Sequence, residues 1–150
     1  MCLTPFLGAL LDFKGKGATM LMVGSIVMCL CHLSFALLLP LYPSKTLALL
    51  LIVTLGVSFS LVPAALWPSV PKIIDAKILG SAYCVIFWIQ NIGLCLTPLL
   101  IGRVLTATGG YRIPMLIFAM FGVVAFIFSL YLKIEDRRKG YGLELPNVKK

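Results

Sequence analysis

Residues Thr46–Val70 (TLALLLIVTLGVSFSLVPAALWPSV) form a run of 25 residues that contains no Asp, Glu, Lys or Arg. A bilayer core about 30 Å thick is crossed by about 20 apolar residues in a helix. Three further uncharged stretches of similar length are Thr19–Leu39, Ser81–Ile101 and Pro114–Leu132. All 13 basic and 5 acidic residues lie outside the four stretches. The sequence therefore predicts an all-α membrane protein, folded as a polytopic helical bundle.

The composition excludes several other classes of protein. Of the 150 residues, 61% are hydrophobic and 12% are charged, whereas soluble domains are nearer half and a quarter. A chain this small has too little interior to hide so much apolar surface from water. We therefore expect no nucleic-acid partner despite the net charge of +8. Cys29, Cys31, Cys84 and Cys95 fall within the spans, and we expect no disulfide, metal site or cofactor.

The basic residues predict the orientation of the spans, because Lys and Arg collect in cytosolic loops. One side would carry ten of them: Lys14, Lys16, Lys72, Lys77, Lys133, Arg137, Arg138, Lys139, Lys149 and Lys150. The other side would carry three, which are Lys45, Arg103 and Arg112. The N-terminal segment, the loop Pro71–Gly80 and the tail are therefore predicted to be cytosolic.

The predicted organisation has two parts. Residues 1–132 would form a partial bundle, in which residues 1–18 are the last turns of a preceding helix and a loop. Residues 133–150 would form a loosely ordered cytosolic tail, because they are polar and contain Gly and Pro. Met1–Phe13 is apolar but too short to span a bilayer, which suggests the C-terminal portion of a larger protein.

Two spans carry candidate substrate contacts. Pro63 and Pro68 each remove a backbone hydrogen bond, so the second span should be kinked or locally open there. Broken helices near a cavity are where transporters place substrate contacts. Ser60 and Trp67 share a face with Pro63, although Trp67 also suits the aromatic belt at the membrane surface.

The third span holds the adjacent amides Gln90 and Asn91, on one face with Tyr83 and Phe87. An amide in hydrocarbon without a partner costs a few kcal/mol, so these side chains should face a cavity or a neighbouring helix. Substrate binding and inter-helix packing both remain open for them. His32 is interpreted as a packing residue, because no acidic residue lies in any span. Small residues four apart suit close helix packing: Gly56 and Ser60, Gly80 and Cys84, Gly93 and Thr97.

The segment Gly8–Lys16 (GALLDFKGK) resembles the G-x-x-x-D-x-x-G-[RK] loop of the major facilitator superfamily. The matching residues are Gly8, Asp12, Gly15 and Lys16. Phe13 and Gly17 stand where that loop usually has further basic residues. In the superfamily this loop joins the second and third helices of each six-helix half.

Three longer strings resemble the lysosomal dipeptide-transporter branch of that superfamily. They are SFSLVPAALWPSVP (58–71), LGSAY (79–83) and IQNIGL (89–94). The resemblance implies that the four spans are the last four helices of a twelve-helix fold, with the second and third lining the cavity. It also implies a uniporter that exports Lys-, Arg- or His-containing dipeptides from the lysosome. Implied partners are the bilayer, a glycosylated lysosomal accessory protein and a second copy in a homodimer.

Alternative functions are a facilitator for another small solute, a four-helix transporter that acts as a dimer, or a four-span protein without transport activity. We expect no enzyme: Ser25 and His32, on one helix, are about 10 Å apart, too far for a catalytic pair. No charged residue lies in a span, so charges that clamp a cationic dipeptide would lie elsewhere in the transporter.

The orientation can be tested by cysteine labelling in a cysteine-free background. Lys45→Cys and Arg112→Cys should react with an impermeant thiol reagent from the lumenal side, because these residues lie on the side poor in basic residues. Labelling of Lys45→Cys only from the cytosolic side would overturn the predicted topology.

Overall fold

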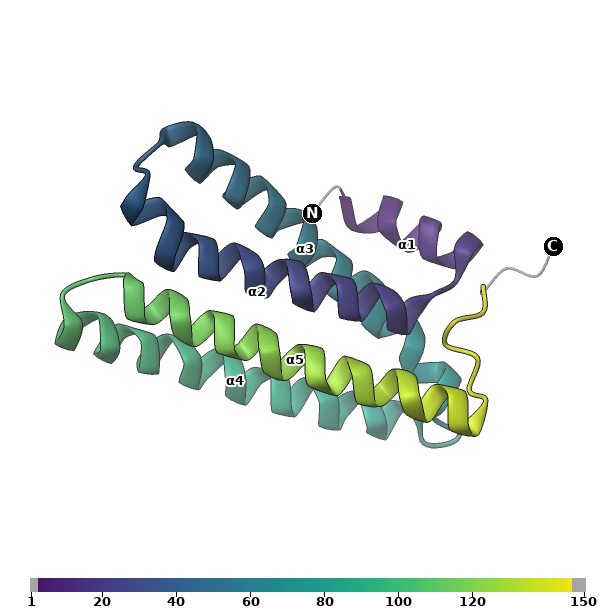
Figure 1. Cartoon of the computed structure of the whole chain (residues 1–150). Coiled ribbons are helices and arrows are strands. Elements are labelled where there is room, and N and C mark those ends of the chain that lie inside the picture. The colour runs from purple at the N-terminus through teal and green to yellow at the C-terminus, as the bar shows by residue number, and fades with distance from the viewer. Residues whose placement is uncertain (1–2, 147–150) are drawn as a thin grey trace.

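The computed structural model describes residues 3–146, without the side chains of residues 3–6, 10 and 12. The described residues form five helices and no strand (Figure 1). These are α1 (Leu3–Lys14), α2 (Gly17–Leu41), α3 (Lys45–Ile73), α4 (Leu79–Thr108) and α5 (Arg112–Lys139). Helices α2 to α5 are long and apolar enough to cross a membrane, and each contains one predicted span. The predicted all-helical, multi-pass bundle is confirmed.

Two helices extend well beyond their predicted spans. Helix α4 continues to Thr108, so Arg103 lies within a helix rather than in a loop. Helix α5 continues to Lys139, so the expectation of a loose tail from Lys133 onward is wrong for its first residues. Each helix ends at a glycine in the left-handed conformation, Gly109 (φ 64°) and Gly140 (φ 69°), which residues with a side chain rarely adopt. Residues 147–150 of the predicted tail lie outside the described residues.

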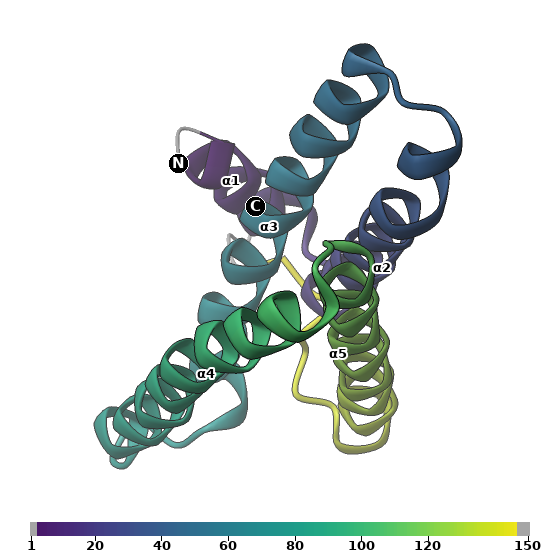
Figure 2. The same ribbon diagram turned by 90° about the vertical axis from the view of Figure 1, so that its left-hand side faces the viewer.

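Helix α2 is the centre of the bundle and lies between α3 and α5 (Figures 1 and 2). A Cβ atom added at Gly24 of α2 would lie 3.0 Å from Val62 of α3. One added at Gly122 of α5 would lie 2.9 Å from the Cβ atom of Cys29 on α2. These two glycines let the helices approach closely, which favours packing where the surrounding solvent is itself apolar.

The glycines whose four-residue spacing suggested close packing are not the two that make these close contacts. A Cβ atom added at Gly56, Gly80 or Gly93 would meet no atom of the described structure within 4 Å. These glycines make no close contact with another described helix, and their role in helix packing stays a prediction. In α3 and α4 they lie on faces that no other helix of the described chain covers.

His32 lies on α2, and its ring faces α5. Its Nδ1 atom donates a hydrogen bond to the Met28 carbonyl on its own helix, at 2.8 Å. Its ring centroid is 5.3 Å from that of Phe118 on α5. This placement supports the interpretation of His32 as a packing residue.

Helix α4 is the least enclosed element. It buries no residue, whereas α2, α3 and α5 each bury five or more. Figure 2 shows α4 and α5 diverging from the loop that joins them. One long membrane helix therefore presents almost its whole surface to whatever surrounds this chain.

The close approach at Gly122 predicts sensitivity to one added methyl group. Gly122→Ala should lower the free energy of unfolding by about 1–3 kcal/mol, because the backbone of Cys29 cannot move aside without shifting α2. Gly56→Ala is the matched control, since it adds the same group to a transmembrane helix in open space. Thermal unfolding in detergent would measure both variants, and equal melting temperatures would contradict the tight α2–α5 contact.

Candidate functional site

Three aromatic side chains meet where α3 ends and α4 begins. The ring centroid of Trp67 on α3 is 4.9 Å from that of Phe87 and 5.9 Å from that of Tyr83, both on α4. The Trp67 and Phe87 rings are stacked, with 26° between their planes. We call Trp67, Tyr83 and Phe87 the aromatic cluster. It brings together two of the predicted substrate-binding residues, Trp67 and Tyr83.

A proline leaves free the carbonyl group that Tyr83 binds in this cluster. Pro71 has no N–H, so the Trp67 carbonyl four residues earlier lacks its usual helical donor. The Tyr83 hydroxyl donates a hydrogen bond to this carbonyl at 3.2 Å. The bond replaces one that the helix cannot make, and it fixes the start of α4 against the end of α3.

Pro63 and Pro68 both lie inside α3, which is helical from Lys45 to Ile73. The helix is therefore not locally open at these prolines, and the alternative of a kink stays a prediction. Each proline still frees a carbonyl, because each lacks the N–H that would bond four residues back.

Among the described residues, one of the remaining predicted contacts bonds to a cluster residue, and it does so through that residue's backbone. Asn91 is exposed, and its Nδ2 atom donates to the Phe87 carbonyl of its own helix at 2.7 Å. Gln90 is exposed and makes no hydrogen bond to any described residue. Ser60 is half-buried on α3, and its hydroxyl donates to the Gly56 carbonyl at 3.0 Å. Within residues 3–146, no hydrogen bond joins Ser60 to either amide.

The four residues that match the superfamily loop, which we call the conformational motif, lie on α1 (Gly8 and Asp12) and in the turn before α2 (Gly15 and Lys16). Gly15 (φ 70°) and Lys16 (φ 64°) both adopt the left-handed conformation, as a tight turn between two helices requires. A Cβ atom added at Gly8 would meet no described atom within 4 Å. The side chain of Asp12 lies outside the described part of the structure.

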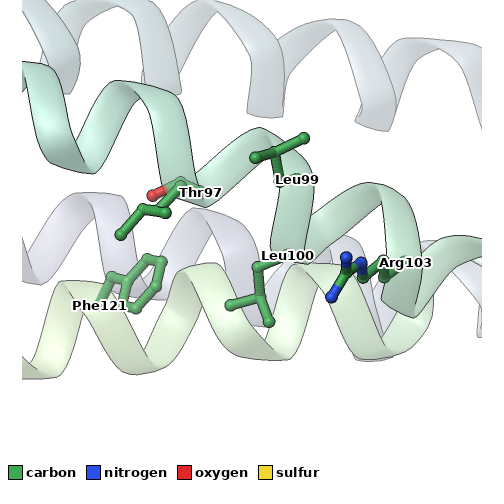
Figure 3. Close-up of a pocket in the computed structure, with 6 residues that line it drawn as sticks. Thr97, Leu99, Leu100, Arg103 and Phe121 are labelled. Carbon is green, nitrogen blue, oxygen red and sulfur yellow. The ribbon is translucent and has the colours of Figure 1, made fainter.

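Arg103 is a residue whose position the sequence analysis missed. It lines an open pocket of about 520 Å³ between α4 and α5, together with Leu96, Thr97, Leu99, Leu100 and Phe121. Figure 3 shows Leu100 and Phe121 pointing toward one another from the two helices. The helix-compatible sequence between Ile101 and Gly109 was the signal that could have placed Arg103 on α4.

Comparison with known proteins finds relatives in the same transporter branch that the sequence motifs resemble. Lysosomal dipeptide transporter MFSD1 of Danio rerio is 32% identical to this chain over 142 residues, which is 95% of the chain. MFSD1 of Mus musculus and of Homo sapiens are 32% and 30% identical over 107 residues, or 71% of the chain. The chain resembles the lysosomal dipeptide transporters. It spans 29% of the length of the Danio rerio protein and 22% of the other two.

No model of a protein family and no solved structure matches the chain. The resemblance to MFSD1 nevertheless confirms the one drawn from the three sequence strings. The matched region of this chain includes the aromatic cluster and the amides of α4, because only 5% of the chain lies outside it.

The bond between Tyr83 and Trp67 predicts a specific loss of stability. Tyr83→Phe keeps the ring but leaves the Trp67 carbonyl without a donor, which should cost about 1–3 kcal/mol. Tyr131→Phe is the matched control, because Tyr131 is 65% exposed and makes no hydrogen bond within residues 3–146. Thermal unfolding followed by tryptophan fluorescence would measure both, and an unchanged Tyr83→Phe midpoint would contradict the assigned bond.

Proposed function

We propose that this chain forms part of a lysosomal membrane transporter that carries dipeptides from the lumen to the cytosol. The observation that carries the proposal is the similarity of almost the whole chain to a protein named as a lysosomal dipeptide transporter. Four helices of membrane-spanning length and composition support it. By the resemblance of its motifs, the transporter is a uniporter of the major facilitator type, and its substrates contain Lys, Arg or His.

Helix α4 is proposed as one wall of the substrate cavity. It buries none of its residues within this chain, and it carries both Gln90 and Asn91 on exposed positions. A primary amide offers two donors and an acceptor, which suits the peptide group of a bound dipeptide. The unpartnered Gln90 side chain is free to make these bonds. The aromatic cluster would close the end of this wall nearest the α3–α4 loop.

The charged contacts of the substrate are proposed to come from other parts of the transporter. A cationic dipeptide requires a carboxylate for its positive groups and a cation for its C-terminus. Arg103 shares α4 with Asn91, but twelve residues of helix separate them by about 18 Å. An extended dipeptide backbone spans only about 7 Å, well short of that separation, so Arg103 is not proposed as part of the amide site. This chain would therefore supply aromatic and amide contacts to the peptide.

The partners follow from the same resemblance. The bilayer covers the apolar outer surface, and the accessory partner would be a glycosylated lysosomal membrane protein. A homodimer would place a second copy beside the first. These assemblies are part of the proposal.

The proposed cavity wall can be tested in the intact transporter that contains this segment. Gln90→Ala and Asn91→Ala should each weaken the apparent affinity for lysyl-alanine by a few-fold to about tenfold, the loss expected for one neutral hydrogen bond. The measurement is dipeptide uptake into proteoliposomes, with melting temperatures recorded on the same samples. Thr106→Val is the matched control, because Thr106 is exposed on α4 but lies more than twenty ångströms from both amides by about 1.5 Å per residue.

The outcomes separate the cavity from simple helix packing. Lower melting temperatures with unchanged affinity would remove both amides from the site. Failure of the intact protein to transport any dipeptide, with correct insertion, would contradict the proposed function itself.

A further inference from the structure

The residues that follow α5 fold back onto the bundle. Gly140 (φ 69°) and Gly142 (φ 75°) reverse the chain. The Leu143 N–H then donates to a carboxylate oxygen of Asp136 at 2.9 Å, and Asp136 itself is 5% exposed. Residues 140–146 therefore have a defined structure, although the sequence predicts a loose tail from Lys133 onward. We call them the clasp.

A buried leucine anchors the clasp. Leu143 is 1% exposed, which makes it one of the most enclosed side chains of the described chain. The space left between the clasp and the helices is about 10 Å³ and is lined by Leu11, Gly17, Ala65 and Ser69 among others. That volume is at the limit for a single water molecule, so Leu143 fills its site.

The backbone of the clasp bonds to the conformational motif. The N–H of Lys16 donates to the Glu144 carbonyl at 3.0 Å, and that of Gly17 to the Leu143 carbonyl at 3.0 Å. A Cβ atom at Gly15 would lie 2.5 Å from the Glu144 carbonyl oxygen, so the clasp fits only against glycine there. The motif turn and the clasp thus fit each other closely.

The Glu144 side chain caps helix α2 from 125 residues away in the sequence. Its carboxylate accepts hydrogen bonds from the Thr19 N–H at 2.9 Å and from the Thr19 hydroxyl at 2.9 Å. The ammonium group of Lys133 on α5 donates to the same hydroxyl at 2.7 Å. Lys16, at the N-cap of α2, makes no capping bond with its side chain. A negative charge at this helix end satisfies free N–H groups and the helix dipole.

A third contact ties the clasp to α3. The ammonium group of Lys72 donates to the carbonyls of Leu145 and Gly142, at 2.8 Å and 3.2 Å. The clasp thereby joins the ends of α1 and α2 to those of α3 and α5. Helix α4 makes none of these bonds.

We propose that the clasp is a conformational lock, which holds this end of α1, α2, α3 and α5 together as one rigid unit. It leaves α4 to shift against that unit, held at its start by the aromatic cluster. The lock requires only this chain; its effect on transport rests on the proposed function. Within a transporter, an intact clasp would make these four helices move together, and opening it would loosen the motif turn.

Hydrogen exchange of the purified full chain in lipid nanodiscs tests the lock. Glu144→Ala should speed exchange of the amides of Lys16, Gly17 and Thr19 by about 2- to 30-fold, the range expected for loss of a helix cap. Leu143→Ser should speed the same amides, because it removes the buried anchor. Glu144→Gln, which keeps the accepting oxygen but not the charge, should speed the exchange of these amides less than Glu144→Ala does.

Glu135→Ala is the matched control. Glu135 is an acidic residue near the same end of α5, and its ion pair with Lys139 at 2.9 Å stays within that helix. Its removal should leave the exchange of residues 15–19 unchanged. Unchanged exchange at these residues in both Glu144→Ala and Leu143→Ser would overturn the lock. Because the measurement involves no dipeptide, its failure is distinguishable from failure of the proposed function.

Discussion

The need to satisfy polar groups inside hydrocarbon governs this structure. Most hydroxyls in the long helices, including those of Ser25, Ser60 and Ser129, donate to the carbonyl four residues earlier on the same helix. Away from the clasp, two side-chain hydrogen bonds cross between helices in the described residues. They run from Ser58 to the Gly24 carbonyl and from Tyr83 to the Trp67 carbonyl. The first joins α3 to α2 at a close glycine contact. The second joins α4 to α3 at a carbonyl that a proline has freed.

The sequence predicted the elements well, because uncharged length is a local property. The four spans and the loop before the first of them follow from neighbouring residues. Helix contacts are not local. Gly56 and Gly93 have the same spacing signal as any packing glycine, yet no described atom approaches them closely, whereas Gly24 and Gly122 make the contacts. Spacing identifies a face that can pack, and only the arrangement of helices decides which face does.

The candidate site was predictable in part for the same reason. Trp67 and Tyr83 meet because sixteen residues with one short loop bring them together, and this pairing could be anticipated. The clasp could not be anticipated from the sequence. Its short sequence with two glycines and a proline shows no helical or strand pattern, and its partner Thr19 lies 125 residues away. A buried leucine and a carboxylate at a distant helix end hold it in place instead.

The uneven enclosure of the helices connects these observations. The end closed by the clasp contains the buried cluster of Leu11, Leu21, Ala64 and Ala65, drawn from α1, α2 and α3. Helix α4, with no buried residue, carries the amides and one side of the aromatic cluster. The chain spans 29% of the length of the Danio rerio relative, and the surface of α4 is the one that packing among the described residues leaves open. Helix α4, which has the most surface available for further contacts, is thus also the helix that carries the candidate amide contacts to a substrate. In a transporter these two roles are compatible, because a cavity wall must face the opposite half of the protein rather than its own.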